Sequence, residues 1–137
     1  MSLFSVFDVA GTGMHAQSIR LNTTSSNLAN ANSASSSTDQ TYRARHPVFS
    51  QIMDSFDTDS STTGVRVMGI IESQTPLKSE YNPGHPMANE EGFIFMPNVN
   101  VVEEMANMIS ASRSYQTNVE VMNTTKEMLM RTLAIGQ

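Results

Sequence analysis

Residues 99–135, VNVVEEMANMISASRSYQTNVEVMNTTKEMLMRTLAI, decide the fold of this chain because their apolar side chains recur at alternating spacings of four and three. That alternation is the heptad rule of a helix that packs along a seam. Pro97 precedes the segment, Asn98 or Asn100 suits the cap of its first turn, and Gly136 follows it. We therefore predict one long helix. Its predicted seam is Val101, Met105, Met108, Ser112, Tyr115, Val119, Met122, Lys126, Leu129 and Leu133.

The same alternation occurs at the start of the chain and predicts a second helix from about Ser2 to Ala34. Its seam is Leu3, Phe7, Ala10, Met14, Gln17, Leu21, Thr24, Leu28 and Ala31. Two helices of similar length at opposite ends of a chain most simply pair antiparallel, which brings both termini to one end. A further stripe on the C-terminal helix, at Val102, Ile109 and Met130, widens its apolar face beyond what one partner helix covers. That width favours burial against other subunits.

The middle of the chain has the pattern of short strands and turns. A serine-rich stretch, 33–41, is typical of a mobile linker with little to bury. Strands are predicted at Val48–Met53, Val65–Ile71 and Phe93–Met96, with a turn at 81–86. The predicted class is α+β, with long N- and C-terminal helices that form an antiparallel coiled-coil hairpin and a small β-rich middle domain. We expect an N-terminal helical arm at 1–34, a Ser-rich linker at 35–44, the middle domain at 45–97 and a C-terminal helical arm at 98–137.

Composition excludes several classes of protein. The chain has 137 residues, of which 39% are hydrophobic, and its longest apolar run is Phe93–Met96, so no membrane span is expected. The absence of cysteine excludes disulfides and thiolate chemistry. The net charge of −5 is concentrated in 51–97, and no basic patch is present to bind nucleic acid. No Lys or Arg precedes the first apolar residues, so we expect no cleaved secretory signal.

No pattern in the sequence predicts catalysis, a cofactor, a metal or a small-molecule substrate. Gly11-Thr12-Gly13-Met14-His15-Ala16 fits a dinucleotide-binding pattern, but no second strand with a terminal acid follows it. Asp54, Asp57 and Asp59 lack the glycine and glutamate of a calcium loop, so they are interpreted as a solvated turn. The histidines have no metal-site spacing.

Four motifs in order resemble the flagellar rod, hook and related axial proteins. The first is Asn27-Leu28-Ala29-Asn30, and the second is Tyr81-Asn82-Pro83-Gly84-His85-Pro86 followed by Glu91-Gly92. The third runs from Pro97-Asn98-Val99-Asn100 through Val119, and the fourth from Lys126 to Gln137. Together they extend over nearly the whole chain.

The resemblance implies a structural subunit of the proximal rod of the bacterial flagellar basal body. Such a subunit polymerises helically through its terminal helices to transmit torque, in contact with itself and other rod subunits. It would be exported by the flagellar type III apparatus, without signal cleavage, and would assemble in the periplasm. The expected assembly interface combines seam and motif residues: Leu3, Phe7, Met14, Leu21, Asn27, Leu28, Ala29, Asn30, Val101, Met105, Met108, Arg113, Tyr115, Asn118, Val119, Met122, Leu129 and Leu133.

Three alternatives remain open from the sequence. A different flagellar rod subunit would share the terminal motifs. A free coiled-coil adaptor would use the same heptads but form a discrete oligomer. A nucleotide-binding enzyme would require a site at Gly11 and Gly13.

Overall fold

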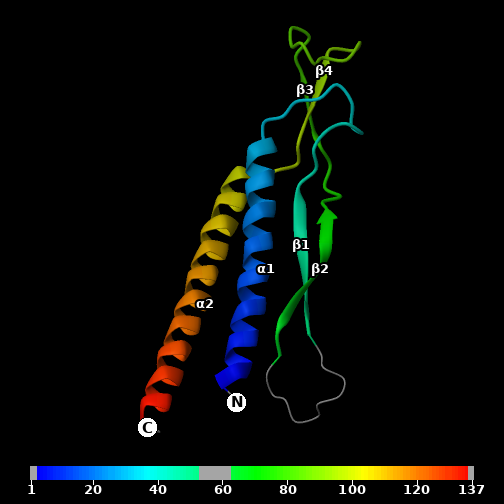
Figure 1. Ribbon diagram of the computed structural model, residues 1–137. Coiled ribbons are helices and arrows are strands. Elements are labelled where there is room, and N and C mark those ends of the chain that lie inside the picture. The colour runs from blue at the N-terminus through cyan, green and yellow to red at the C-terminus, as the bar shows by residue number, and fades with distance from the viewer. Residues whose placement is uncertain (1–2, 53–62, 136–137) are drawn as a thin grey trace.

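The computed structural model describes residues 3–52 and 63–135 (Figure 1). Along the chain, one long helix comes before the four short strands and another comes after them, which confirms the α+β class. The elements are α1 (Leu3–Asn30), β1 (Arg45–Gln51), β2 (Val65–Glu72), β3 (Lys78–Tyr81), β4 (Phe93–Met96) and α2 (Val101–Ile135). The helix α1 ends four residues before the predicted Ala34, and β1 begins three residues before the predicted Val48.

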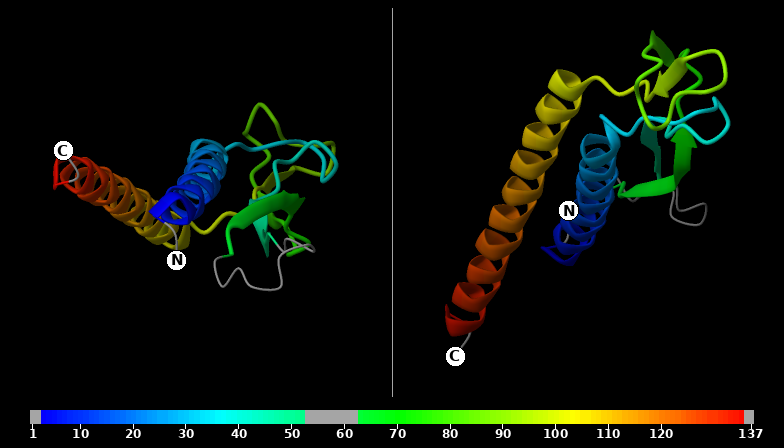
Figure 2. Two further views of the ribbon diagram at one scale, coloured as in Figure 1. Left: turned by 60° about the horizontal axis from the view of Figure 1, so that its bottom comes forward. Right: turned by 90° about the horizontal axis from the view of Figure 1, so that it is seen from above.

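The helix α1 lies between α2 and the β1–β2 hairpin in every view (Figures 1 and 2). The two helices run antiparallel, so the N- and C-terminal ends lie at the same end of the molecule, as the sequence predicts. Across the pair, the Arg20 guanidinium of α1 donates to Asn107 Oδ1 of α2 at 2.7 Å. The β3–β4 pair extends beyond the opposite end of the helices (Figure 1).

The strands form two separate two-stranded antiparallel sheets in place of one β unit. In the first sheet, Arg45 of β1 pairs with Glu72 of β2, and Gln51 pairs with Val65. The second sheet pairs Lys78–Tyr81 with Phe93–Met96. β3 was not predicted from the sequence, because Lys-Ser-Glu-Tyr has no apolar alternation and is exposed throughout its length.

A β-bulge changes which side chains of β2 face α1. Val48 pairs with Gly69 and Phe49 pairs with Val67, so Met68 is the extra residue. A regular strand would continue the alternation from Val67 to Gly69 and Ile71. With the extra residue, Ile70 lines the space beside α1 together with Val67. The simple period of two predicted from the sequence therefore holds only up to Val67.

The serine-rich stretch is held by specific contacts, although we expected it to bury little. Ser35 exchanges two backbone hydrogen bonds with Phe95 of β4, at 2.9 and 3.0 Å. Ser35 and Thr41 are both buried. Thr41 also donates its hydroxyl to the Ser37 carbonyl at 2.7 Å. Backbone pairing does not depend on side-chain hydrophobicity, which explains why composition missed it.

Small side chains dominate the interior. The buried hydrophobic residues within the described ranges are Ala10, Ala16, Ala31, Ala44, Ile94, Val99 and Ala111. Ala31, Ala44 and Val99 form a cluster, against which Tyr42 packs, where the end of α1 meets the start of β1 and the start of α2. An alanine-rich core of this kind contributes little hydrophobic free energy compared with a core of Leu, Ile and Phe. Most large apolar side chains of α2 remain partly or largely exposed.

Candidate assembly interface

Asn27 connects the end of α1 to the hairpin through side-chain hydrogen bonds. Its side chain is fully buried. Its Oδ1 accepts hydrogen bonds from the Arg45 N–H at 2.9 Å and from the Tyr42 hydroxyl at 2.8 Å, while its Nδ2 donates to the Arg45 carbonyl at 2.8 Å. An amide side chain supplies both a donor and an acceptor, as this backbone exchange requires. Asn27 therefore fixes the angle between α1 and β1.

Asn98 makes the corresponding connection ahead of α2. Its Oδ1 accepts from the Ala44 N–H at 2.8 Å, and its Nδ2 donates to the carbonyls of Thr75 at 2.8 Å and Ser73 at 3.3 Å. Asn100 performs the capping role, since its Oδ1 accepts from the Val102 N–H at 3.2 Å. The two candidates for the cap thus have different roles. Asn98 joins the middle segments, and Asn100 begins the helix.

The contact between α1 and α2 is made by small and polar residues. A Cβ added at Gly13 would lie 3.1 Å from Asn118 Nδ2, so the helices come close at this glycine. Thr125 is buried and satisfies its hydroxyl with the Val121 carbonyl at 2.7 Å. The buried positions on these helices are Ala10, Ala16, Thr23, Thr24 and Asn27 on α1, with Glu104, Ala111 and Thr125 on α2.

The buried face of α2 is displaced from the predicted seam. Glu104, Ala111 and Thr125 each lie one residue before the seam positions Met105, Ser112 and Lys126. The close approach at Gly13 favours small residues such as Ala111 on this face, although the half-buried seam residues Met122 and Leu129 lie on the same side of the helix. The heptad pattern alone could not indicate this, since it follows the spacing of apolar residues and does not report how closely two helices approach.

The large apolar residues at the start of α2 form an exposed stripe. Val102 is 76% exposed, Met105 is 52% exposed and Ile109 is 56% exposed. Helical periodicity places them about a third of a turn or more from Ala111 and Asn118, which face α1. This α2 stripe (Val102, Met105 and Ile109) is therefore not covered by the chain's own helix pair.

A matching partly exposed line follows α1. Phe7, Met14, Leu21 and Leu28 are half-buried and lie about a quarter of a turn from Gly13, which faces α2. Both helices are right-handed and run in opposite directions. A rotation of the same sense from their line of contact therefore takes both sets of residues to the same side of the pair. That side is directed away from the hairpin.

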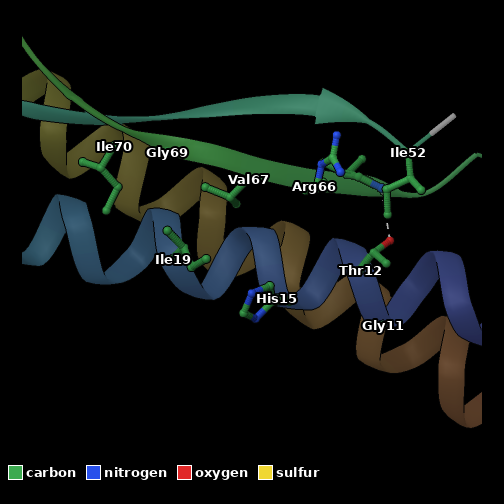
Figure 3. A pocket seen from close by; sticks show the side chains of 10 residues that line it. Gly11, Thr12, His15, Ile19, Ile52, Arg66, Val67, Gly69 and Ile70 are labelled. Atoms are coloured by element: carbon green, nitrogen blue, oxygen red, sulfur yellow. Dashed lines mark hydrogen bonds between the residues drawn. The ribbon is translucent and has the colours of Figure 1, made fainter.

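A groove opens between α1 and the β1–β2 hairpin, with a cavity volume of about 760 Å³. Figure 3 shows Val67 and Ile70 of β2 above Ile19 of α1. At its other end, the Val65 N–H donates to Thr12 Oγ1 at 3.2 Å. This hairpin groove is lined by Gly11, Thr12, His15, Ile19, Ile52, Val65, Arg66, Val67, Gly69 and Ile70.

Comparisons with known proteins bear on the same elements. A family model described as flagella basal body rod protein matches residues 7–34, and one described as flagellar basal body rod FlgEFG protein C-terminal matches residues 90–135. The chain is 50% identical to the flagellar basal-body rod protein FlgC of Salmonella typhimurium over 137 residues, which is 100% of both chains. It is 51% identical to FlgC of Escherichia coli over the same full length. A FlgC of Buchnera aphidicola is 43% identical over 139 aligned residues, again with 100% of both chains covered.

This chain belongs to the FlgC family. It is thus a structural subunit of the flagellar basal-body rod. The two matched segments contain nearly all of α1 and α2, together with β4. No helix in the described ranges is long and apolar enough to cross a membrane.

Within this FlgC-family chain, the expected interface residues occupy different environments. Asn27 is buried, whereas Ala29, Val101, Met105, Arg113, Tyr115 and Leu133 are exposed. The half-buried residues are Phe7, Met14, Leu21, Leu28, Asn30, Met108, Asn118, Val119, Met122 and Leu129. The side chain of Leu3 lies outside the described residues. Sequence reasoning missed Asn98 as a junction residue and Arg20 as a link between the helices.

The motifs considered above for chemistry form no recognisable binding site in the described part of this FlgC-family fold. Gly11 and Gly13 lie inside α1, far from the strand-to-helix turn that a dinucleotide site needs. No group of three or more His, Cys, Asp or Glu able to hold a metal occurs among residues 3–52 and 63–135. Asp54, Asp57 and Asp59 lie outside those ranges. The relatives named above are structural rod proteins.

Proposed function

We propose that this rod subunit belongs to the proximal rod and polymerises helically through α1 and α2 to transmit torque, without enzymatic activity. The partners would be other copies and other rod subunits. The resemblance to axial proteins further supports passage through the flagellar type III export apparatus, without a cleaved signal, and assembly in the periplasm.

The exposed α2 stripe is the observation that carries this proposal. Val102, Met105 and Ile109 are each more than half exposed, while the buried positions of α2 are Glu104, Ala111 and Thr125. Large apolar side chains stabilise an assembly when neighbours remove them from water, by about 25 cal/mol per Å² of apolar surface. A subunit with small residues inside and large apolar residues on its surface gains this free energy only when other subunits cover that surface.

The two helical arms and the middle then have separate roles. We propose arms at 1–34 and 98–137, a linker at 35–44 and a middle unit at 45–97. The arms would pack along the predicted heptad seams, in the manner of coiled coils, against neighbouring subunits as well as against each other. The half-buried line from Phe7 to Leu28 supports this, since it lies on the same side of the helix pair as the α2 stripe.

Met105→Asp tests the assignment directly. Its side chain is 52% exposed, so the carboxylate should leave the isolated subunit folded but make the assembled contact unfavourable. Expressed in a flagellated strain that lacks its own copy of the subunit, the variant should abolish basal-body rods and swimming. The control is Ser110→Asp, which adds the same charge on another exposed side of α2. Normal swimming with Met105→Asp would contradict the assignment of this face.

The alternative function, a coiled-coil adaptor that is not part of the rod, predicts a different result for the unsubstituted chain. An adaptor would not restore swimming to a strain lacking the rod subunit. A rod subunit of the same type should restore it, and electron microscopy of isolated basal bodies would show the completed rod.

A further inference from the structure

Methionine is the side chain of this protein that is most open to oxidation. The chain has 11 methionines and no cysteine, so the thioether sulfurs are its only sulfur atoms. Oxidation to the sulfoxide turns a flexible apolar side chain into a polar one and disrupts contacts that methionine makes. The important methionines are therefore those that are exposed in the free subunit and lie on a surface that other subunits cover.

Met105 meets both conditions. It is 52% exposed, and it lies in the α2 stripe between Val102 and Ile109, which are also more than half exposed. Met108 lies less than one turn further along the same helix but is half-buried. The helix thus presents one methionine side chain to solvent beside another that the fold partly covers.

A peroxide supplies the oxygen atom for the reaction. The Met105 sulfur uses a lone pair to attack one oxygen of hydrogen peroxide, and the O–O bond breaks as the S–O bond forms. The other oxygen leaves as water, which takes up both protons of the peroxide. The thioether loses two electrons and the peroxide gains them, so the step needs no further reactant.

We propose that Met105 is an oxidation site that controls assembly: a peroxide converts it to the sulfoxide in the free subunit, and the sulfoxide keeps that subunit out of the rod. The proposal rests on the assembly function proposed above and adds its regulation. Burial of a polar group without a hydrogen-bond partner is unfavourable, so a neighbour that packs on the α2 stripe binds the sulfoxide form less tightly. In the rod, the same neighbour covers Met105 and protects it from oxidation.

Met68 provides a control within the same molecule. It is the extra residue of the β2 bulge and is 61% exposed, so it should be oxidised as readily as Met105. It belongs to the hairpin, and α1 lies between the hairpin and α2 (Figures 1 and 2). A sulfoxide at Met68 therefore adds the same polar group to the subunit without changing the α2 stripe.

Peptide mapping by mass spectrometry locates the oxidation. When the purified, dilute protein is treated with hydrogen peroxide, one oxygen should be added to Met105 and Met68 before the half-buried Met108 and Met122. In basal bodies isolated from cells with this chain as their only copy of the subunit, the same treatment should spare Met105. Oxidation of Met105 no faster than that of Met108 in the free protein, or equally fast in the free protein and in basal bodies, would overturn the proposal.

Substitutions test the consequence in a strain that lacks its own copy of the subunit. Met105→Gln gives the side chain a polar, uncharged end at little cost in helix propensity, and it should cause loss of swimming. Met68→Gln should swim like the unsubstituted chain. Circular dichroism of both purified variants should match that of the unsubstituted protein, which separates a failed contact from failed folding. Normal swimming with Met105→Gln would refute the control of assembly.

Met105→Leu decides the question if the glutamine variant does not fold. Leucine has no sulfur, so after a pulse of peroxide these cells should form new basal bodies at a larger fraction of their own untreated number than cells with Met105. If the unsubstituted chain restores swimming but both strains lose equal fractions, the oxidation site is wrong and the rod function stands. If the unsubstituted chain does not restore swimming, the rod function itself fails.

Discussion

Asn27 shows why one polar side chain can matter more than its neighbours in the same motif. The sequence pattern draws equal attention to Asn27, Leu28, Ala29 and Asn30, yet only Asn27 is fully buried with its amide bonded to both backbone groups of Arg45. Replacing it would leave the N–H and the carbonyl of Arg45 without these partners at a part-buried site, which is more costly than the loss of an exposed hydrogen bond.

We expect Asn27→Ala to lower the free energy of unfolding by about 1–3 kcal/mol. Urea unfolding followed by circular dichroism measures this. The control is Asn22→Ala, an exposed asparagine on the same helix, which should leave the free energy of unfolding nearly unchanged. Equal effects at both positions would show that the contacts of Asn27 contribute nothing to stability.

The two glycines of α1 provide a second, matched test. Gly11 has open space where a Cβ would stand, whereas a Cβ at Gly13 would meet Asn118 at 3.1 Å. Gly11→Ala should raise the free energy of unfolding by about 1 kcal/mol through helix propensity. Gly13→Ala gains the same propensity but must displace Asn118, so its net gain should be smaller. Identical gains, measured by the same unfolding experiment, would contradict the close approach of the helices.

The elements themselves were largely predictable, while their contacts were not. Periodicity predicted both helices and β2, because spacing along a chain reports local structure directly. It did not predict β3, which has no alternation, or the bulge at Met68, which arises from pairing with β1. Nor did it predict the face that α2 turns to α1, since Gly13 decides that face through space and not through hydrophobicity.

Hydrogen exchange should reveal unequal stability among the elements. In dilute purified protein, we expect slow exchange at the junction formed by Asn27 and Asn98, and faster exchange along α2 toward Leu133, where the side chains are largely exposed. Mass spectrometry of peptic fragments gives this profile. Assembled rods should lose the difference. Uniform protection along both helices of the dilute protein would instead indicate a finished bundle that needs no neighbours.

Among residues 3–52 and 63–135, the buried hydrophobic side chains are mainly alanines, while many large apolar side chains are exposed. Burial by neighbouring subunits would account for that exposed apolar surface. We therefore expect the purified chain to be monomeric at micromolar concentration, because each single contact is modest and a rod requires many at once. Sedimentation velocity measures this. A discrete, stable oligomer under these conditions would favour a coiled-coil adaptor over a rod subunit.

Composition and short motifs carry different information about the function of this chain. The heptads, the absence of cysteine and the acidic middle gave no reason to expect thiolate chemistry or binding to nucleic acid, but they agree with many structural proteins. The short motifs indicated the family, because several of them occur together in the same order. No rule of spacing predicts the role of each residue within them. Asn98 is an example, since its three hydrogen bonds join segments more than twenty residues apart in the chain.

The antiparallel helix pair gives the subunit two unlike ends. Both termini lie at one end, and the β3–β4 pair projects from the other (Figure 1). If copies stack head to tail along the helix direction, every copy points the same way, and the polymer has polarity. Its two tips then present different chemistry to incoming subunits, so growth can proceed from one tip while the other is anchored.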